Sequence, residues 1–287
     1  MTTLKGTQEA PYTFLSYGGG VQSNALLVLA AQGKVHFDAI WFANVGDDSE
    51  NPKTLRYVND IAKPFAAQHG IPFHEVQVTK RNGDKDTLLQ AIERRQGSVV
   101  IPTLVEASGK NSRTCTVDFK IRVINRHIKR VAPDAYVRMG IGFSIDEWTR
   151  ARDTDWHSHY GSNESKNPEP LGFWRQNYYP LLDMGISRAD CVGITTGAGL
   201  PTPPKSSCFF CPYHRRGEWV EMKQQEPALF AEACRIDDLL SARYRRLQGK
   251  GAFLHPDRKP LREAVPDQML MFAPEEDLTC EVGHCMT

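Results

Sequence analysis

The stretch Ser16 to Ser23 constrains the fold more than any other part of the sequence, because three consecutive glycines separate a strand pattern from a helix pattern. The aromatic and β-branched residues 11–15 are typical of a strand, and the apolar run 24–32 is typical of a helix. The first backbone N–H groups of a helix lack intrahelical acceptors, and glycines let a phosphate approach the main chain. The pattern therefore predicts an anion site in an α/β fold.

The two common phosphate-loop motifs, G-x-x-x-x-G-K-[S/T] and G-x-G-x-x-G, do not occur in this stretch. It resembles instead the Ser-Gly-Gly-x-Asp-Ser loop of the PP-loop ATP pyrophosphatases, with Gly18 in place of the first Ser and Gln22 in place of the Asp. The resemblance implies an adenine nucleotide α-hydrolase-like fold that binds ATP with Mg²⁺. The residues that it assigns to the nucleotide here are Ser16, Gly18, Gly19, Gly20, Gln22 and Ser23.

Composition restricts the class of protein. The 287 residues are 40% hydrophobic and 24% charged, which is typical of a globular protein with a sizeable core. A net charge of +1 argues against general electrostatic attraction to nucleic acid, so such contacts would have to be local. We expect a cytoplasmic protein that does not enter a membrane, because neither a signal peptide nor an 18-residue apolar run is present. Seven cysteines without an export signal favour thiol or metal chemistry over disulfides.

The sequence up to about residue 200 alternates strand and helix patterns, which predicts a doubly wound, mostly parallel sheet. Further strands are expected at 36–44, 71–78 and 136–142, and helices at 52–69, at 86–95, from about 116 onward and at 187–199. The polar residues 153–176 predict a long loop, followed by a short strand at 177–183. We therefore assign residues 10–200 to a nucleotide-binding α/β domain and 201–287 to a helical, cysteine-bearing C-terminal region.

Two segments that follow predicted strands are expected at the edge where open α/β sheets bind ligands. They resemble a segment of the phosphoadenosine-phosphosulfate-reductase-like branch of the PP-loop family and a family segment that closes over the α-phosphate. The matching positions are Asn44, Gly46, Asp47, Gly140, Glu147 and Arg150. The resemblance implies nucleotide contacts for the first three and Gly140, and a catalytic Arg150, whose guanidinium suits a negatively charged phosphorus centre. Helix capping and surface arginines remain the alternative.

Cys208 and Cys211 form a C-x₂-C turn in which two thiolates can reach one metal. Cys115, just before a predicted helix, is the expected third ligand, whereas Cys191 and Cys234 lie in helical patterns typical of core positions. The three metal candidates resemble the [4Fe–4S] cysteines of tRNA-thiolating PP-loop enzymes, in which the fourth iron carries a sulfide. Structural zinc, with His214 or Cys285 as fourth ligand, is the alternative, and spacing does not separate the two.

Residues 280–285, Cys-Glu-Val-Gly-His-Cys, resemble the Glu-Cys-Gly-x-His segment of sulfonucleotide reductases but do not match its order. Cys280 and Cys285 are both candidate catalytic thiols. The favoured function is an ATP-dependent sulfurtransferase that adenylates a carbonyl oxygen and replaces it with sulfur. The acceptor would be tRNA, DNA, a free nucleobase or another amide-like carbonyl, and a sulfur or electron donor is required. A sulfonucleotide reductase and a zinc-stabilised, non-catalytic nucleotide-binding module stay open, as does a homodimer.

Overall fold

The computed structural model describes residues 5–106, 109–152, 154–160 and 169–266. Its centre is a six-stranded sheet in the order β3-β2-β1-β5-β7-β6, in which only β6 runs antiparallel to its neighbour. The strands are β1 (Tyr12–Tyr17), β2 (Ala39–Ala43), β3 (Phe73–Val76), β5 (Tyr136–Ile141), β6 (His157–Tyr160) and β7 (Glu169–Tyr178). The predicted doubly wound, mostly parallel α/β fold is confirmed, and the carboxyl ends of β1, β2 and β5 meet at one edge of the sheet.

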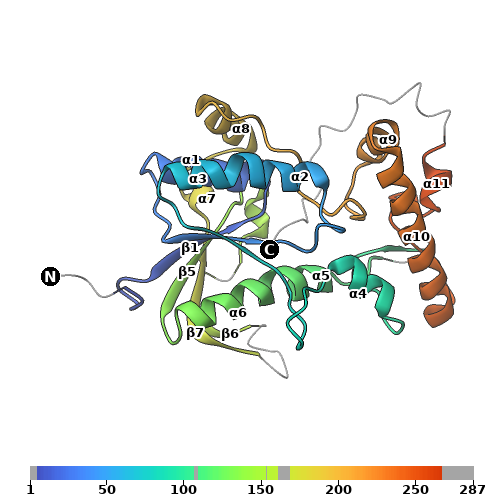
Figure 1. Cartoon of the computed structure of the whole chain (residues 1–287), viewed down its shortest axis with the longest axis horizontal. Coiled ribbons are helices and arrows are strands. Elements are labelled where there is room, and N and C mark those ends of the chain that lie inside the picture. The colour runs from blue at the N-terminus through green and yellow to red at the C-terminus, as the bar shows by residue number, and fades with distance from the viewer. Residues whose placement is uncertain (1–4, 107–108, 153, 161–168, 267–287) are drawn as a thin grey trace.

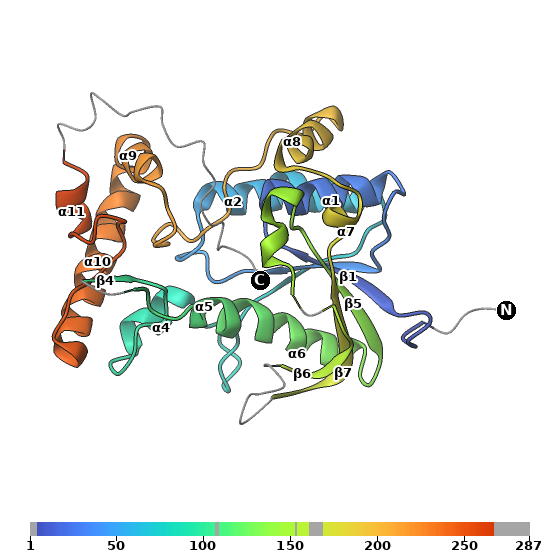
Figure 2. The same cartoon turned by 180° about the vertical axis from the view of Figure 1, so that it is seen from behind.

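Helices cover both faces of the sheet (Figures 1 and 2). One face carries α1 (Val21–Ala31), α2 (Pro52–Tyr57), α3 (Lys63–Gln68), α7 (Pro180–Asp183) and α8 (Arg188–Gly197), packed on Leu15, Ile40 and Phe42. The other carries α6 (Arg122–Val131), packed on Phe14, Val137 and Met139. Single π-helical turns, Val58–Ala62 and Val117–Ile121, join α2 to α3 and α5 (Thr114–Thr116) to α6. Both faces of β2 are therefore buried, as its continuous apolar sequence predicts, whereas His74 and Glu75 of β3 are exposed.

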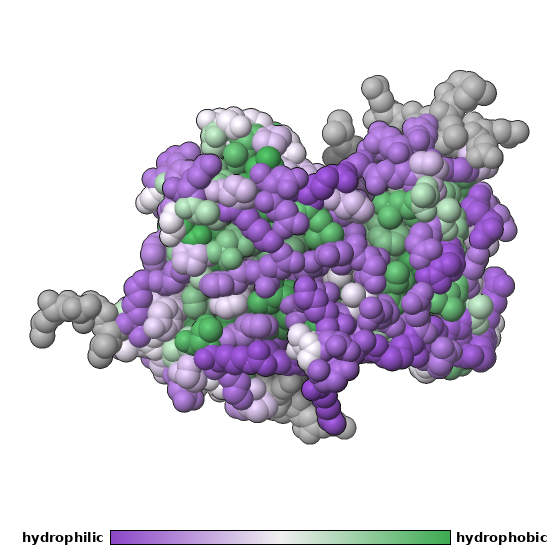
Figure 3. Space-filling model, viewed as in Figure 1, coloured by the Kyte–Doolittle hydropathy of each residue, from purple (hydrophilic) through white to green (hydrophobic). Residues whose placement is uncertain are grey.

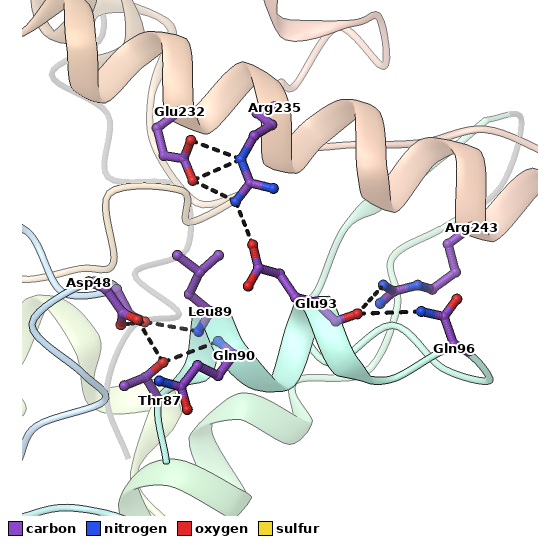
Figure 4. Close-up of polar contacts among 10 residues, drawn as sticks. Asp48, Thr87, Leu89, Gln90, Glu93, Gln96, Glu232, Arg235 and Arg243 are labelled. Carbon is purple, nitrogen blue, oxygen red and sulfur yellow. Dashed lines mark hydrogen bonds and ion pairs between the residues drawn. The ribbon is translucent and has the colours of Figure 1, made fainter. Parts of the chain in front are cut away.

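The predicted helical C-terminal region is present and packs beside one end of the sheet (Figure 1). It consists of α9 (Arg216–Gln225), α10 (Pro227–Gln248), α11 (Leu261–Ala264) and β8 (Ala252–Phe253), which pairs with β4 (Leu104–Val105). Its core, around Trp219 and Phe210, also takes in α4 (Leu88–Arg94). Figure 4 shows Glu93 of α4 paired with Arg235 of α10 at 2.7 Å, so the two parts of the chain share one interface.

Residues 153–176 were predicted to form a loop, and that prediction is wrong for 157–160 and 169–176, whereas 153 and 161–168 lie outside the described residues. They contain β6 and most of β7, an antiparallel pair at the sheet edge. Leu171 and Phe173 are buried beneath α6, and Arg175 donates to Asn125 of that helix. These alternate residues all face inward, but the polar composition of the segment hides the alternation. The short strand predicted at 177–183 is also wrong beyond Tyr178, because Pro180–Asp183 is helical.

Polar side chains are spread over the face of the molecule seen in Figure 3. Within the described residues, the helices are all too short or too polar to cross a lipid bilayer.

Candidate functional site

The glycine loop, Gly18 to Gly20, connects β1 to the N-terminus of α1. Gly19 has a φ of +80°, and a Cβ added to it would lie 2.8 Å from Cγ2 of Thr54. Gly20 is the N-cap of α1, where no side chain caps the helix and no acidic residue occupies the first turn. An uncapped N-terminus directs N–H groups and a positive dipole outward, which is the chemistry that binds a phosphate.

Gln22, where the PP-loop motif has Asp, links two charged side chains across the site. Its Nε2 donates to Glu147 Oε2 at 2.8 Å, and its Oε1 accepts from Arg188 Nη1 at 2.9 Å. Glu147 is also paired with Arg150, which lies over the Phe143 ring. An Asp at position 22 would place a second carboxylate against Glu147, so a neutral amide that both donates and accepts is the residue that this network requires.

The two glycines at the end of β5 have different surroundings. Gly140 is paired within the sheet, and a Cβ added to it would lie 2.7 Å from the Phe37 ring, so its small size serves packing. A Cβ added to Gly142 would lie 3.0 Å from the backbone N of Ser23, in the first turn of α1. Gly142, which the sequence interpretation passed over, is thus the β5 glycine that contacts the phosphate-loop helix.

Asn44, Gly46 and Asp47, predicted to contact the nucleotide, shape the segment that follows β2. Asn44 donates to Asp47 at 2.8 Å and to Glu75 at 2.7 Å, and its Oδ1 accepts from the Gly46 N–H. Gly46 has a φ of +123° and lies so close to Thr87 that no side chain fits. These contacts fix the backbone of the segment, and a nucleotide role for the three residues remains a prediction.

The same segment caps two helices. Asn51 caps α2 by accepting from the Lys53 N–H in its first turn. Asp48 accepts from Thr87 at 2.9 Å, and Ser49 accepts from the Leu89 N–H at 2.9 Å, so both hold the start of α4 (Figure 4). The segment after β2 therefore ties the sheet to the C-terminal core.

The cysteine turn is joined to this segment by a short antiparallel bridge. Glu50 pairs with Cys208, and the Asn51 N–H donates to the Ser207 carbonyl at 3.2 Å. The chain just before the turn also touches the glycine loop, because a Cβ added to Gly20 would lie 3.4 Å from the Ser206 hydroxyl. The C-x₂-C turn and the predicted phosphate loop are therefore neighbours.

The three predicted metal ligands lie on segments that approach one another. Cys211 N–H donates to the Cys208 carbonyl at 3.0 Å, and Cys115 and Cys208 pack against the same hydrophobic core. The ammonium of Lys110, five residues before Cys115, lies 5.1 Å from the centre of the Tyr213 ring. No three Cys, His, Asp or Glu side chains within the described ranges are grouped closely enough to hold a metal ion. The shared metal centre therefore remains a prediction.

His214 is not available as the fourth zinc ligand. It is buried, its Nε2 lies 3.0 Å from the Cys208 carbonyl oxygen, and its Nδ1 lies 3.3 Å from Glu218 Oε2. Both ring nitrogens thus face hydrogen-bond acceptors, which a metal ligand does not allow. The predicted catalytic thiols Cys280 and Cys285 lie outside the described residues.

Cys191 and Cys234 are buried core residues, as predicted. Cys191 packs with α1 and Cys234 packs with the C-terminal helices. Burial raises the pKa of the Cys191 thiol to about 12 and that of Cys234 to about 11. Both thiols are therefore protonated and unreactive near neutral pH.

Glu218 holds the cysteine turn in place, and we expect Glu218→Gln to destabilise the protein by roughly 1–3 kcal/mol at pH 7. Its Oε2 accepts from Lys205 at 2.6 Å and from the Arg215 N–H at 2.7 Å. Burial raises the pKa of this carboxyl, but His214 and Lys205 lower it, with a net value of about 2. Chemical denaturation at several pH values measures the effect.

Because the pKa in the folded state is depressed, this stabilisation is complete above pH 4.5, the ordinary Glu value, and is lost as the pH falls toward 2. The difference between wild type and Glu218→Gln should therefore shrink over that range. Glu221→Gln is the matched control, since Glu221 lies on the same helix, is 53% exposed and is 3.5 Å from its partner Lys53. Equal stability of Glu218→Gln and Glu221→Gln at pH 7 would contradict the assignment.

Comparison with known proteins gives limited information. No protein-family model matches the sequence, and no curated protein matches it. A search of solved structures finds similarity to the U34-tRNA thiolase NcsA from Methanococcus maripaludis with its [4Fe–4S] cluster. The identity is 13% and the TM-score 0.42, over 86% of this chain and 72% of that one. Similarity at this level assigns no activity to the chain.

Proposed function

We propose that the protein binds ATP with its phosphates at the N-terminus of α1 and catalyses an ATP-dependent sulfur transfer. The observation that carries the proposal is that Ser206, just before the cysteine turn, lies beside Gly20, while Cys208 of the turn is bridged to Glu50 in the segment that follows β2. An activated phosphoester and a sulfur nucleophile have to meet within a few ångströms for such a transfer. An uncapped helix N-terminus beside a C-x₂-C turn supports both requirements.

The chemistry has two steps. A carbonyl oxygen of the acceptor attacks the α-phosphorus, the bond to the β-phosphate breaks, and pyrophosphate leaves. A sulfur nucleophile then attacks the activated carbon, and AMP leaves with the original oxygen. Arg150 and Arg188, held by Glu147 and Gln22, are the cations beside the phosphate loop that can stabilise the charge developing in the first step.

The sulfur step needs a thiol or a donor held by the cysteines, and Cys115, Cys208 and Cys211 are the proposed residues. Since the described side chains form no three-donor group, no step is assigned to an iron–sulfur cluster or to zinc. The proposed acceptor is a nucleobase, in tRNA, in DNA or free, whose amide-like carbonyl suits adenylation.

Pyrophosphate release from ATP and Mg²⁺ tests the proposal, with tRNA, DNA and free nucleobases as acceptors and sulfide as donor. We expect AMP and pyrophosphate to form in equal amounts with one acceptor class. Absence of ATP binding and cleavage under all conditions would refute the proposal. Binding of adenosine phosphosulfates without ATP cleavage would indicate the sulfonucleotide reductase instead, and nucleotide binding without any product would indicate a non-catalytic module.

A further inference from the structure

Glu50 is a buried acid with an unsatisfied oxygen. Glu50 is 2% exposed, and its Oε2 has no hydrogen-bond partner within the described part of the chain. The buried hydroxyl of Thr54, one turn further on, also lacks a partner there. A buried carboxylate oxygen without a donor is costly, so such an arrangement indicates a missing proton or cation.

The bridge between Glu50 and Cys208 determines which way the acid faces. Directly opposed residues of an antiparallel pair carry their side chains on the same face. Glu50 and Cys208 therefore share a face, and Ser206, two residues before Cys208, lies beside Gly20, because a Cβ added to Gly20 would lie 3.4 Å from the Ser206 hydroxyl. Thr54 lies beside Gly19, because a Cβ added to Gly19 would lie 2.8 Å from the Thr54 methyl carbon. The two unsatisfied oxygens thus belong to Thr54, which borders the glycine loop, and to Glu50, which is bridged to the segment that borders it.

The other carboxylates of this edge already have partners. Asp48 accepts from Ser49 and Thr87, and Glu147 accepts from Gln22. Asp47 is exposed and accepts from Asn44. Gln22 is neutral, and both polar atoms of its amide are already engaged.

We propose that Glu50 is the protein ligand of the Mg²⁺ ion that accompanies the nucleotide phosphates, with the Thr54 hydroxyl as a neutral second oxygen. This inference rests on the proposed function, because the ion arrives with ATP. Mg²⁺ takes oxygen ligands and is usually held by one or two carboxylates together with phosphates and water. Such a site does not need three protein side chains as ligands. This is consistent with the described residues, among which no three Cys, His, Asp or Glu side chains are grouped closely enough to hold a metal ion. Glu50 would supply the charge that Gln22 does not.

The test compares wild type with Glu50→Gln, which keeps the shape of the side chain and removes its charge. The affinity for ATP is measured by calorimetry with Mg²⁺ and again with EDTA, and Mn²⁺ bound with ATP is measured by electron paramagnetic resonance. We expect Mg²⁺ to tighten ATP binding at least about 10-fold in wild type and less than about 3-fold in Glu50→Gln. In EDTA the variant should bind ATP as tightly as wild type or more tightly, because a negative charge near the phosphates is gone.

Thermal unfolding separates this role from a structural one. Without ligand, Glu50→Gln should melt at or above the wild-type temperature, because an unpaired buried charge has been removed. Asp60→Asn, which removes an equal charge from an exposed position on the turn between α2 and α3, should leave the Mg²⁺ effect unchanged. If Mg²⁺ tightens ATP binding equally in wild type and Glu50→Gln, the inference about Glu50 is overturned, but the proposed function is not. Failure of wild type to bind ATP in either condition overturns the proposed function and this inference with it.

Discussion

Replacing Gly19 with alanine is expected to weaken ATP binding by roughly 10- to 100-fold, which corresponds to about 1.4–2.8 kcal/mol. A non-glycine residue in the left-handed region costs about 1–2 kcal/mol. The new methyl group would also lie 2.8 Å from Cγ2 of the buried Thr54. The loop can relieve both problems only by changing its backbone, which moves the N–H groups at the start of α1 away from the phosphates. Calorimetric titration with ATP measures the loss.

Gly33→Ala is the matched control for Gly19→Ala. Gly33 has a φ of +71° just after the other end of α1, and a Cβ added there meets nothing within 4 Å. The variant should lose about 1 kcal/mol of stability and keep the wild-type affinity for ATP. If Gly19→Ala bound ATP as tightly as Gly33→Ala, the glycine loop would not be the phosphate site.

Structural features that depend only on a short stretch of sequence could be predicted. The strand, glycine turn and helix around Gly19 follow from local periodicity, although α1 begins at Val21, three residues earlier than the apolar run suggested. Asn51 and the Ser187–Asp190 capping box mark helix starts, because capping is decided within one turn. The burial of Cys191 follows from its place in an apolar helical pattern.

Features that depend on distant partners were not predictable. Gln22 is 166 residues from Arg188 in the sequence, and neither residue carries a local sign of the contact. The alternation of β7 is hidden because its inward-facing residues include Arg175, a buried cation that donates to Asn125 of α6 and to Asn177. Gly142 does stand at the exit of a predicted strand, but its contact with α1 follows from the packing of β5 beside β1. Hydrogen-bonded pairs of polar residues that are far apart in the sequence produce no periodic pattern from which they could be predicted.

Replacing Cys208 with alanine is expected to separate the two chemical steps. The phosphates are proposed to bind at the start of α1, beside Ser206, and the Cys208 thiol is proposed to act only in the later sulfur step, so pyrophosphate release should stay within about 3-fold of wild type. The backbone bridge to Glu50 needs no side chain at position 208. The thiolated product should fall at least 100-fold, since its formation needs the sulfur nucleophile, a loss of about 2.7 kcal/mol or more in transition-state stabilisation.

Cys191→Ala is the control for a thiol that is present but unreactive. Burial against α1 leaves Cys191 protonated, so its loss should cost some stability and change neither step by more than about 2-fold. Mass spectrometry of the acceptor gives the product, and iron, sulfide and zinc analysis of anaerobically purified samples shows whether Cys208→Ala also loses a metal. Normal product from Cys208→Ala would remove the cysteine turn from the chemistry. Loss of pyrophosphate release from a folded Cys208→Ala protein would instead mean that the thiol acts before the acceptor is adenylated.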